Sequence, residues 1–371
     1  MNLWEIAPFH NSLNDNQIIT LSIVYVSSLS LSLIGSFSVV VVSIIKRRHL
    51  NEQVRPLLHL SVADFLASAV LLCTSALNFV SPSTLLHSIN ICERCLPLAL
   101  TFYCISFLLV IVYAYESKRA VQGWRERSEE GQDEQVEHHS MSEDRERGWP
   151  LRVYAMVWLG PIIMYFVYIC TVSLMEGLIQ RSPGDTGSNE AMSNDHRIFC
   201  TSCILLLHIG NDTCPHVDKS HDLFVKSFFF VCVTSVLICC SVLYCKVGSW
   251  YRRYQERGMF LVEGDGFGRR HLRGLYSTPH SMMLVIIICW TPAFILVSLS
   301  FTGWIHQEKL FPLYVIQALT VSLHGLLDSI VYGWLRRNFR EAALGERMPL
   351  LATPPKAFYD ESLSMTLTEN Q

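Results

Sequence analysis

The sequence contains few charged residues, and long stretches of it contain almost none. Asp, Glu, Lys and Arg make up 16% of the 371 residues, whereas 50% are apolar. This composition fits either a large soluble protein or a membrane protein, so the distribution of charge has to decide. A helix needs about 20 residues to cross ~30 Å of hydrocarbon. Seven nearly uncharged runs reach that length, at residues 18–45, 57–80, 96–115, 153–175, 223–245, 281–302 and 312–335.

A soluble protein rarely needs even one uncharged run of that length, so a globular fold of buried helices is the weaker alternative. The sequence predicts an all-α fold, a bundle of seven transmembrane helices over residues 18–340. An extracellular segment, 1–17, precedes it, and a disordered cytoplasmic tail, 341–371, follows it. We expect a long outer loop at 176–222 and a disordered inner loop at 117–150, where acidic and basic residues alternate without apolar periodicity.

Positive charge is missing from the N-terminus. The first 17 residues contain no Lys or Arg, so they lack the basic region that opens a cleavable signal peptide, and we expect the first span to be retained. An outside N-terminus places all but six of the 29 Lys and Arg residues on the cytoplasmic side, which is the orientation that basic loops favour. After the last span, residues 336–344 predict a short amphipathic helix at the headgroup boundary.

Cysteine is unevenly distributed. Two Cys-x-x-Cys pairs, 92/95 and 200/203, lie on the predicted outer face and have a spacing found in zinc sites. An oxidising exterior favours disulfide bonding instead. The sequon that begins at Asn211 lies in the same outer loop, so glycosylation is expected there. The cysteines of the outer face are Cys92, Cys95, Cys200, Cys203 and Cys214.

Two carboxylates lie inside the predicted spans, although apolar residues surround them. Asp64 is in "LLHLSVADFLASAVLL" and Asp328 in "LTVSLHGLLDSIVYGW". A central Asp costs roughly 2.5 to 3.5 kcal/mol on insertion scales, so such residues usually face a bundle interior and mark function. His324 lies one helical turn before Asp328, so the two can form a local pair. The alternative is that both carboxylates only tie helices together. One histidine with two carboxylates is not a recognisable hydrolase site, so we expect no enzymatic activity.

Four motifs occur in the spans where one receptor superfamily has them. The sixth span contains "CWTP", the second contains "LSVADFLAS", the fourth contains a lone Trp158, and the seventh ends in "DSIVYGWLRRNF". With these motifs, residues 18–340 resemble the rhodopsin-like G-protein-coupled receptors. Within that superfamily the chain is most similar to the transmembrane protein 116 group. The resemblance implies a seven-helix receptor fold.

The third span agrees with this resemblance in register. With Cys92 as the disulfide cysteine of the superfamily, Ser106 and Glu116 fall where a sodium-site serine and the acidic residue of the Asp/Glu-Arg-Tyr motif are expected. The resemblance implies a disulfide from Cys92 to the outer loop, with Cys200 as the partner, or Cys203 or Cys214. It also implies a pocket for Na⁺ or a proton formed by Asp64, Ser106 and Asp328, with His324 beside them.

The resemblance also implies residues that change conformation during signalling. Trp290 would form the floor of a ligand pocket, and Pro292 would act as the hinge of the sixth span, because proline removes a backbone donor. A cytoplasmic switch would involve Glu116, Arg119, Tyr244 and Tyr332. The sequence departs from the superfamily in several places. The fifth span lacks the proline that the superfamily has there. Ser36 stands where the superfamily usually has Asn, and Ser329 stands where it has Pro. Ser117 stands in place of the arginine that engages a G protein.

These observations predict a multi-pass membrane protein, an orphan receptor-like signal transducer with an atypical coupling motif. Its ligand would be extracellular or membrane-borne, and Ala99, where amine receptors carry Asp, argues against a monoamine. The expected partners are a heterotrimeric G protein or arrestin and membrane lipid, and nucleic acid is not expected. The plasma membrane is favoured over an endomembrane. The alternatives are a non-signalling membrane scaffold and a lipid or ion transporter that uses the pocket of Asp64 and Asp328.

Overall fold

The structure is a computed structural model of the whole chain, and most of the residues that it describes are helical. Those parts are residues 13–45, 55–79, 82–129, 139–179, 203–207, 219–256, 266–302 and 307–334. The long helices are α1 (Asp15–Ile45), α2 (Arg55–Leu77), α3 (Pro82–Glu129), α4 (His139–Ile179), α6 (Lys219–Glu256) and α7 (Gly266–Thr302). The last span consists of η3 (Gln307–Leu310), α8 (Phe311–Ser322), α9 (His324–Asp328) and the π-helix η4 (Ser329–Trp334).

Five of the described helices are long and apolar enough to cross a membrane, and the bent pair α8 and α9 makes a sixth span if it is counted as one. These helices correspond to six of the seven predicted spans. The fifth predicted span falls in α6, whose described apolar part, Val225–Cys239, is shorter. The all-helical, multi-pass fold is therefore confirmed, while the count of seven and the orientation stay predictions.

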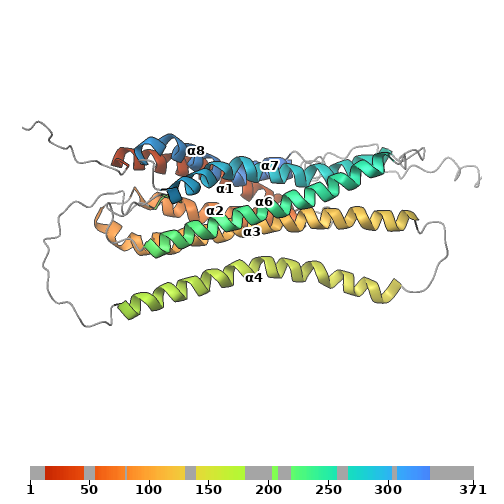
Figure 1. Cartoon of the computed structure of the whole chain (residues 1–371), viewed down its shortest axis with the longest axis horizontal. Coiled ribbons are helices and arrows are strands. Elements are labelled where there is room, and N and C mark those ends of the chain that lie inside the picture. Colours follow the sequence, from red (N-terminus) through yellow and green to blue (C-terminus); the bar gives the residue numbers. More distant parts are fainter. Residues whose placement is uncertain are drawn as a thin grey trace, which may run out of the picture.

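The helices run along a common direction, with α4 along one side of the bundle beside α3 (Figure 1). The most apolar window of α3 is 67% buried, whereas that of α4 is only 6% buried. Helix α3 is therefore the central element, and α4 presents most of its apolar side chains outward. An apolar outer face of this kind is suited to lipid, which is as apolar as the side chains themselves.

Helix also continues beyond the predicted spans. It covers 117–129 at the end of α3 and 139–150 at the start of α4, where we expected an unstructured linker. These segments are rich in Glu, Arg and Gln, which lose little side-chain freedom in a helix, and they allow pairs of opposite charge one turn apart. The amphipathic helix predicted at 336–344 and the tail lie outside the described residues.

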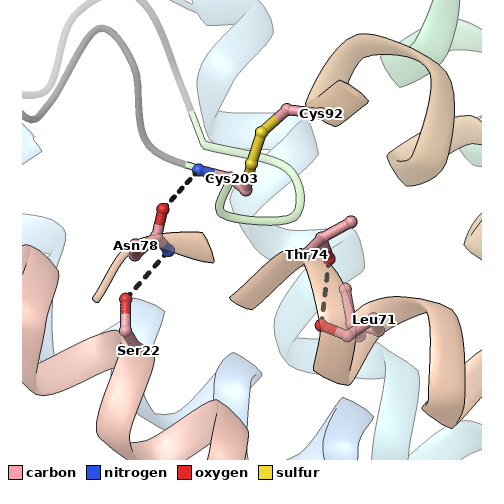
Figure 2. Close-up of a disulfide and its surroundings, with 6 residues drawn as sticks. All are labelled: Ser22, Leu71, Thr74, Asn78, Cys92 and Cys203. Carbon is pink, nitrogen blue, oxygen red and sulfur yellow. Dashed lines mark hydrogen bonds between the residues drawn. A yellow bond between two sulfur atoms is a disulfide. The ribbon is translucent and has the colours of Figure 1, made fainter. Parts of the chain in front are cut away.

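The short segment 203–207 is buried at the end of the bundle that is predicted to face outward, and we call this end the outer end. A disulfide joins Cys203 to Cys92 at the outer part of α3, with 5.4 Å between the Cα atoms (Figure 2). The backbone N–H of Cys203 donates to the side chain of Asn78 at 2.9 Å. The predicted disulfide of Cys92 is thus confirmed, but its partner is Cys203 and not the first-named Cys200. Cys200, Cys214 and Asn211 lie outside the described residues.

Two glycines bring α1 close to the last span. A Cβ added to Gly325 would lie 2.6 Å from Ser32 Oγ and 2.8 Å from Ser36 Oγ, and one added to Gly35 would lie 2.9 Å from Leu326 Cδ1. The last span bends by 42° between α8 and α9. This bend and the close packing place His324 and Asp328 against α1 and α2.

Candidate functional site

Four polar side chains from three helices meet in the bundle interior, and we call this group the polar pocket. Asp64 comes from α2, Ser106 from α3, and His324 and Asp328 from α9. The exposed fraction is 1% for Asp64, 0% for Ser106 and His324, and 4% for Asp328. The predicted ion-pocket residues are therefore brought together, and they are enclosed by protein. Their predicted role in binding Na⁺ or a proton remains a prediction.

Asp64 is held by a short hydrogen bond. The hydroxyl of Ser106 donates to Asp64 Oδ1 at 2.7 Å. The other carboxylate oxygen, Oδ2, is buried and has no hydrogen-bond partner among the described residues. Burial of an unpaired polar atom opposes folding by about 1 to 3 kcal/mol. The pocket therefore keeps one oxygen of Asp64 open at a cost to stability.

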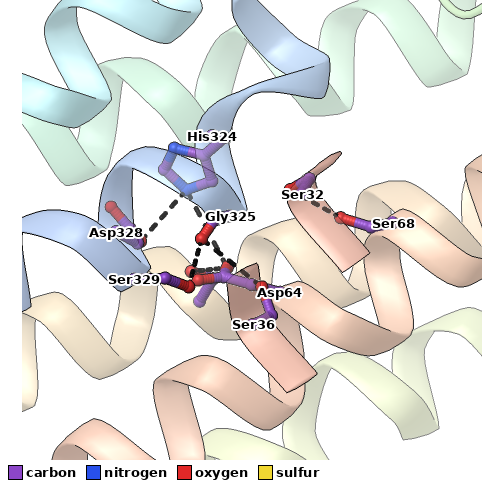
Figure 3. Close-up of polar contacts among 9 residues, drawn as sticks. Ser32, Ser36, Asp64, Ser68, His324, Gly325, Asp328 and Ser329 are labelled. Carbon is purple, nitrogen blue, oxygen red and sulfur yellow. Dashed lines mark hydrogen bonds and ion pairs between the residues drawn. The ribbon is translucent and has the colours of Figure 1, made fainter. Parts of the chain in front are cut away.

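His324 lies between the two carboxylates (Figure 3). Its Nε2 is 3.6 Å from Asp328 Oδ2 and 4.0 Å from Asp64 Oδ1. Neither ring nitrogen has a hydrogen-bond partner in the part of the chain that the structure describes. The predicted local pair of His324 and Asp328 is confirmed as a contact, and Asp64 joins it from the neighbouring helix.

The backbone of Gly325 fixes the position of this pair. Its carbonyl accepts hydrogen bonds from Ser329 Oγ at 2.6 Å and from Ser36 Oγ at 3.4 Å. Beside it, Ser68 Oγ donates to Ser32 Oγ at 3.2 Å and links α2 to α1. Hydroxyl groups of three helices thus surround the pocket. The π-helix η4 begins at Ser329, where the superfamily has proline, and such irregular turns are frequent at functional sites.

A group of aromatic rings lies on the other side of His324. The Trp290 ring centroid on α7 is 6.1 Å from that of His324, and Phe107 is 6.0 Å from the same imidazole. Trp290 itself is 1% exposed and meets the edge of Tyr103 at 4.8 Å. His324 therefore contacts the acidic and the aromatic group at once. Pro292 follows Trp290 on α7, which is helical on both sides of it, and its role as a hinge stays a prediction.

The end of α3 that is predicted to be cytoplasmic shows a different arrangement. The hydroxyl of Tyr154 on α4 donates to both carboxylate oxygens of Glu116, each at 3.1 Å. Glu116 thus pairs with α4 in a chain that lacks the usual following arginine. The side chains of Arg119, Tyr244 and Tyr332 lie outside the described residues, so the predicted switch is not brought together here.

The residue types of the polar pocket are ones that can hold a cation or a proton. Suitable ligand atoms of Asp64, His324 and Asp328 all lie within 4.8 Å of one another. Two carboxylates so close together in a buried site favour a shared proton or a bound cation, because like charges there repel strongly. The oxygens of Asp64, Ser106 and Asp328 fit a hard cation such as the Na⁺ that the resemblance implies, whereas the imidazole fits a softer metal.

Several residues of this site were not among the predicted ones. Gly325, Ser32, Ser68, Tyr103 and Phe107 contact the pocket or its aromatic side. For Gly325 a signal exists, since glycine stands between His324 and Asp328 in an otherwise apolar helix and such a glycine often marks a close backbone approach. The aromatic residues of α3 carry no such signal, because their spacing resembles that of any buried helix face.

A comparison with protein families finds a match. The family model described as "Transmembrane protein 116" matches residues 20–350. The matched region contains the described spans, apart from residues 15–19 at the start of α1, and the whole polar pocket.

Proposed function

This chain belongs to the transmembrane protein 116 family and is a multi-pass membrane protein, and from that premise we propose that it is a receptor-like signal transducer. In this proposal the polar pocket and Trp290 form one switch, and catalysis plays no part. The signal passes from an extracellular or membrane-borne ligand to the cytoplasmic face. The plasma membrane is the proposed location.

The observation that carries the proposal is the position of His324. Its imidazole lies between the carboxylates of Asp64 and Asp328 on one side and the ring of Trp290 on the other. A cation or proton that enters the pocket changes the field at His324 strongly, because the surroundings are buried and of low dielectric. Movement of His324 then alters the packing of Trp290, and with it α7.

A ligand can drive such a switch only if it binds one arrangement better than the other. In this proposal the ligand acts near Trp290, and the pocket ion or proton sets the balance between the two arrangements. Pro292 lets the outer and inner parts of α7 move separately, since its ring removes one helix hydrogen bond. A heterotrimeric G protein or arrestin binds the cytoplasmic face after α7 has moved. The coupling is atypical, because Glu116 pairs with Tyr154 and is followed by Ser117.

The test is a transducer panel in cells. Proximity sensors for each class of Gα subunit and for arrestin are measured against the surface expression of the tagged chain, with and without ligand panels. We expect a signal from at least one transducer that rises with surface expression. Asp64→Asn should reduce this signal several-fold, because it removes one charge of the pocket while keeping the shape of the side chain.

The matched control is Asp15→Asn, the same substitution at an exposed aspartate in the first turn of α1. It should leave the response unchanged. If no transducer responds to the protein while it is verified at the surface, the signalling proposal is wrong. If both variants reduce the response equally, the polar pocket has no special part in it.

A second candidate function, ion translocation, is supported by a line of buried hydroxyl groups along α1. Ser22, Ser28 and Ser32 are all buried, and Ser22 Oγ accepts a hydrogen bond from Asn78 near the outer end at 2.9 Å. These groups extend from the pocket toward the outer face. Ion flux in reconstituted vesicles that Asp328→Ala abolishes would support transport, and silent vesicles would remove it. The scaffold alternative has no comparable observation in its favour.

A further inference from the structure

We propose that the polar pocket binds a divalent transition-metal cation of the Zn²⁺ class, through Asp64, His324 and Asp328, in place of the Na⁺ that the resemblance implies. Metal binding can be measured whether or not the protein signals. The inference therefore stands or falls separately from the proposed function.

The donor set selects the class of metal. Imidazole is a preferred ligand of Zn²⁺, Cu²⁺ and Ni²⁺, whereas sites for hard cations are built from oxygen donors alone. Here Nε2 of His324 is the atom that faces both carboxylates. Asp64 and Asp328 can supply two negative charges, which a divalent cation balances and a monovalent one does not. An unbalanced charge in a buried site is costly.

The distances suit a single ion. The separations from His324 Nε2 are 3.6 Å to Asp328 Oδ2 and 4.0 Å to Asp64 Oδ1. Ligands about 2.0 to 2.1 Å from a tetrahedral Zn²⁺ are about 3.4 Å from each other. The ligand atoms of the three residues lie within 4.8 Å of one another, so in this proposal side-chain rotations bring all three donors to such an ion. A fourth position remains for water or for a ligand of the protein.

The open atoms of the pocket are a second, independent observation. Both nitrogens of the fully buried His324 and Oδ2 of the buried Asp64 have no hydrogen-bond partner among the described residues. A metal ion on Nε2 gives His324 a ligand bond where it has no hydrogen bond, and rotation of the Asp64 carboxylate can turn the open Oδ2 toward the same ion. Ser106, which donates to Asp64 Oδ1, then acts as a positioning residue that orients a metal ligand.

The experiment uses the full-length protein in detergent, freed of metal with a chelator and with its accessible thiols alkylated. Zn²⁺ binding is measured by competition with a fluorescent Zn²⁺ indicator, and Co²⁺ is titrated as a spectroscopic substitute. We expect one molar equivalent of tightly bound Zn²⁺. Co²⁺ should show the visible bands of a site with nitrogen and oxygen ligands and no thiolate band in the near ultraviolet. Excess Na⁺ should not displace either ion.

Variants locate the site. His324→Asn should weaken Zn²⁺ binding at least tenfold and remove the Co²⁺ bands, and Asp328→Asn should do the same through a different ligand. Ser106→Ala should weaken binding by about tenfold, as expected for a residue that only orients a ligand. The matched control is His59→Asn, which removes a partly buried histidine that stacks on Tyr154 with 4.9 Å between ring centroids and lies outside the pocket. The His59→Asn variant should still bind one molar equivalent of Zn²⁺.

Three results would overturn the proposal. The first is that the wild-type protein binds no stoichiometric Zn²⁺ or Co²⁺. The second is that the folded His324→Asn and Asp328→Asn variants bind metal as well as the wild type does. The third is that Na⁺ at physiological concentration displaces the metal. Folding of each variant is checked by its unfolding midpoint in metal-free buffer. If one variant does not fold, the other variant and the wild-type Co²⁺ spectrum still show whether the metal binds in the polar pocket.

Discussion

The outer end of the bundle and the polar pocket both place polar side chains inside a membrane protein, but they treat these side chains in opposite ways. At the outer end, Asn78 uses both halves of its amide, accepting from the N–H of Cys203 and donating to Ser22 Oγ, each at 2.9 Å. In the pocket, His324 and Asp64 keep atoms without hydrogen-bond partners among the described residues. Satisfied polar groups stabilise a fold, whereas open ones weaken it unless a ligand fills them.

This difference separates a structural region from a functional one. The outer end is locked by a disulfide and matched hydrogen bonds, so substitutions there should lower stability. The pocket is held in place by Gly325 and the serines around it, yet His324 and Asp64 keep atoms without hydrogen-bond partners among the described residues. Substitutions of these groups should therefore change function more than they lower stability.

The largest effect is expected from loss of the outer disulfide. Cys203→Ala removes a cross-link between residues 111 positions apart, and loss of a native disulfide typically costs about 2 to 5 kcal/mol. We expect strongly reduced surface expression and a lower unfolding midpoint. Cys95→Ser, at a free and partly buried cysteine on the same helix as Cys92, is the control and should behave like the wild type. Equal behaviour of the two variants would show that the outer lock does not stabilise the protein.

The next effect concerns the support of the pocket. Gly325→Ala places a Cβ 2.6 Å from Ser32 Oγ and 3.2 Å from Asp64 Cβ, and overpacking of this kind costs about 1 to 3 kcal/mol. Thermal unfolding of the purified protein measures the loss. Gly160→Ala is the matched control, because nothing lies within 4 Å of its added Cβ, and it should be neutral or slightly stabilising. Ser32→Ala in the Gly325→Ala background should restore part of the loss.

A third substitution reverses the sign of the effect. His324→Leu removes two buried nitrogens that lack hydrogen-bond partners among the described residues, so in metal-free buffer it should raise the free energy of unfolding by about 1 kcal/mol. Asn78→Leu at the outer end removes matched hydrogen bonds and should lower the free energy of unfolding by a similar amount. Unfolding midpoints of the two variants test the contrast. A loss of stability in both variants would remove the distinction between the two regions.

The smallest effect is expected at the end of α3 that is predicted to be cytoplasmic. Tyr154→Phe removes the hydroxyl that donates to Glu116. Glu116 is only partly buried, so the loss should be about 0.5 to 1 kcal/mol. A small decrease of the unfolding midpoint, absent when Glu116 has already been changed to Gln, would show that the two residues act as a pair. Additive effects in the double variant would indicate that they act independently.

Sequence patterns predict the spans well, because charge is costly in hydrocarbon wherever it occurs. The grouping of Asp64, Ser106 and Asp328 followed from motif positions and from the register of the third span. Two features could not be predicted in this way. The choice of Cys203 as the disulfide partner depends on the path of a loop, and the close approach of Gly325 to Ser32 depends on the packing of distant helices. The helical extensions at 117–129 and 139–150 could not be predicted from apolar periodicity, because these charged segments have none.

The central claim is that the polar pocket retains open, unstabilising groups for its function. The most direct measurement is the transducer response of His324→Leu compared with that of the wild type at equal surface expression. We predict that the variant is at least as stable as the wild type in metal-free buffer and that its response is lost. A response at the wild-type level in this variant would contradict the claim.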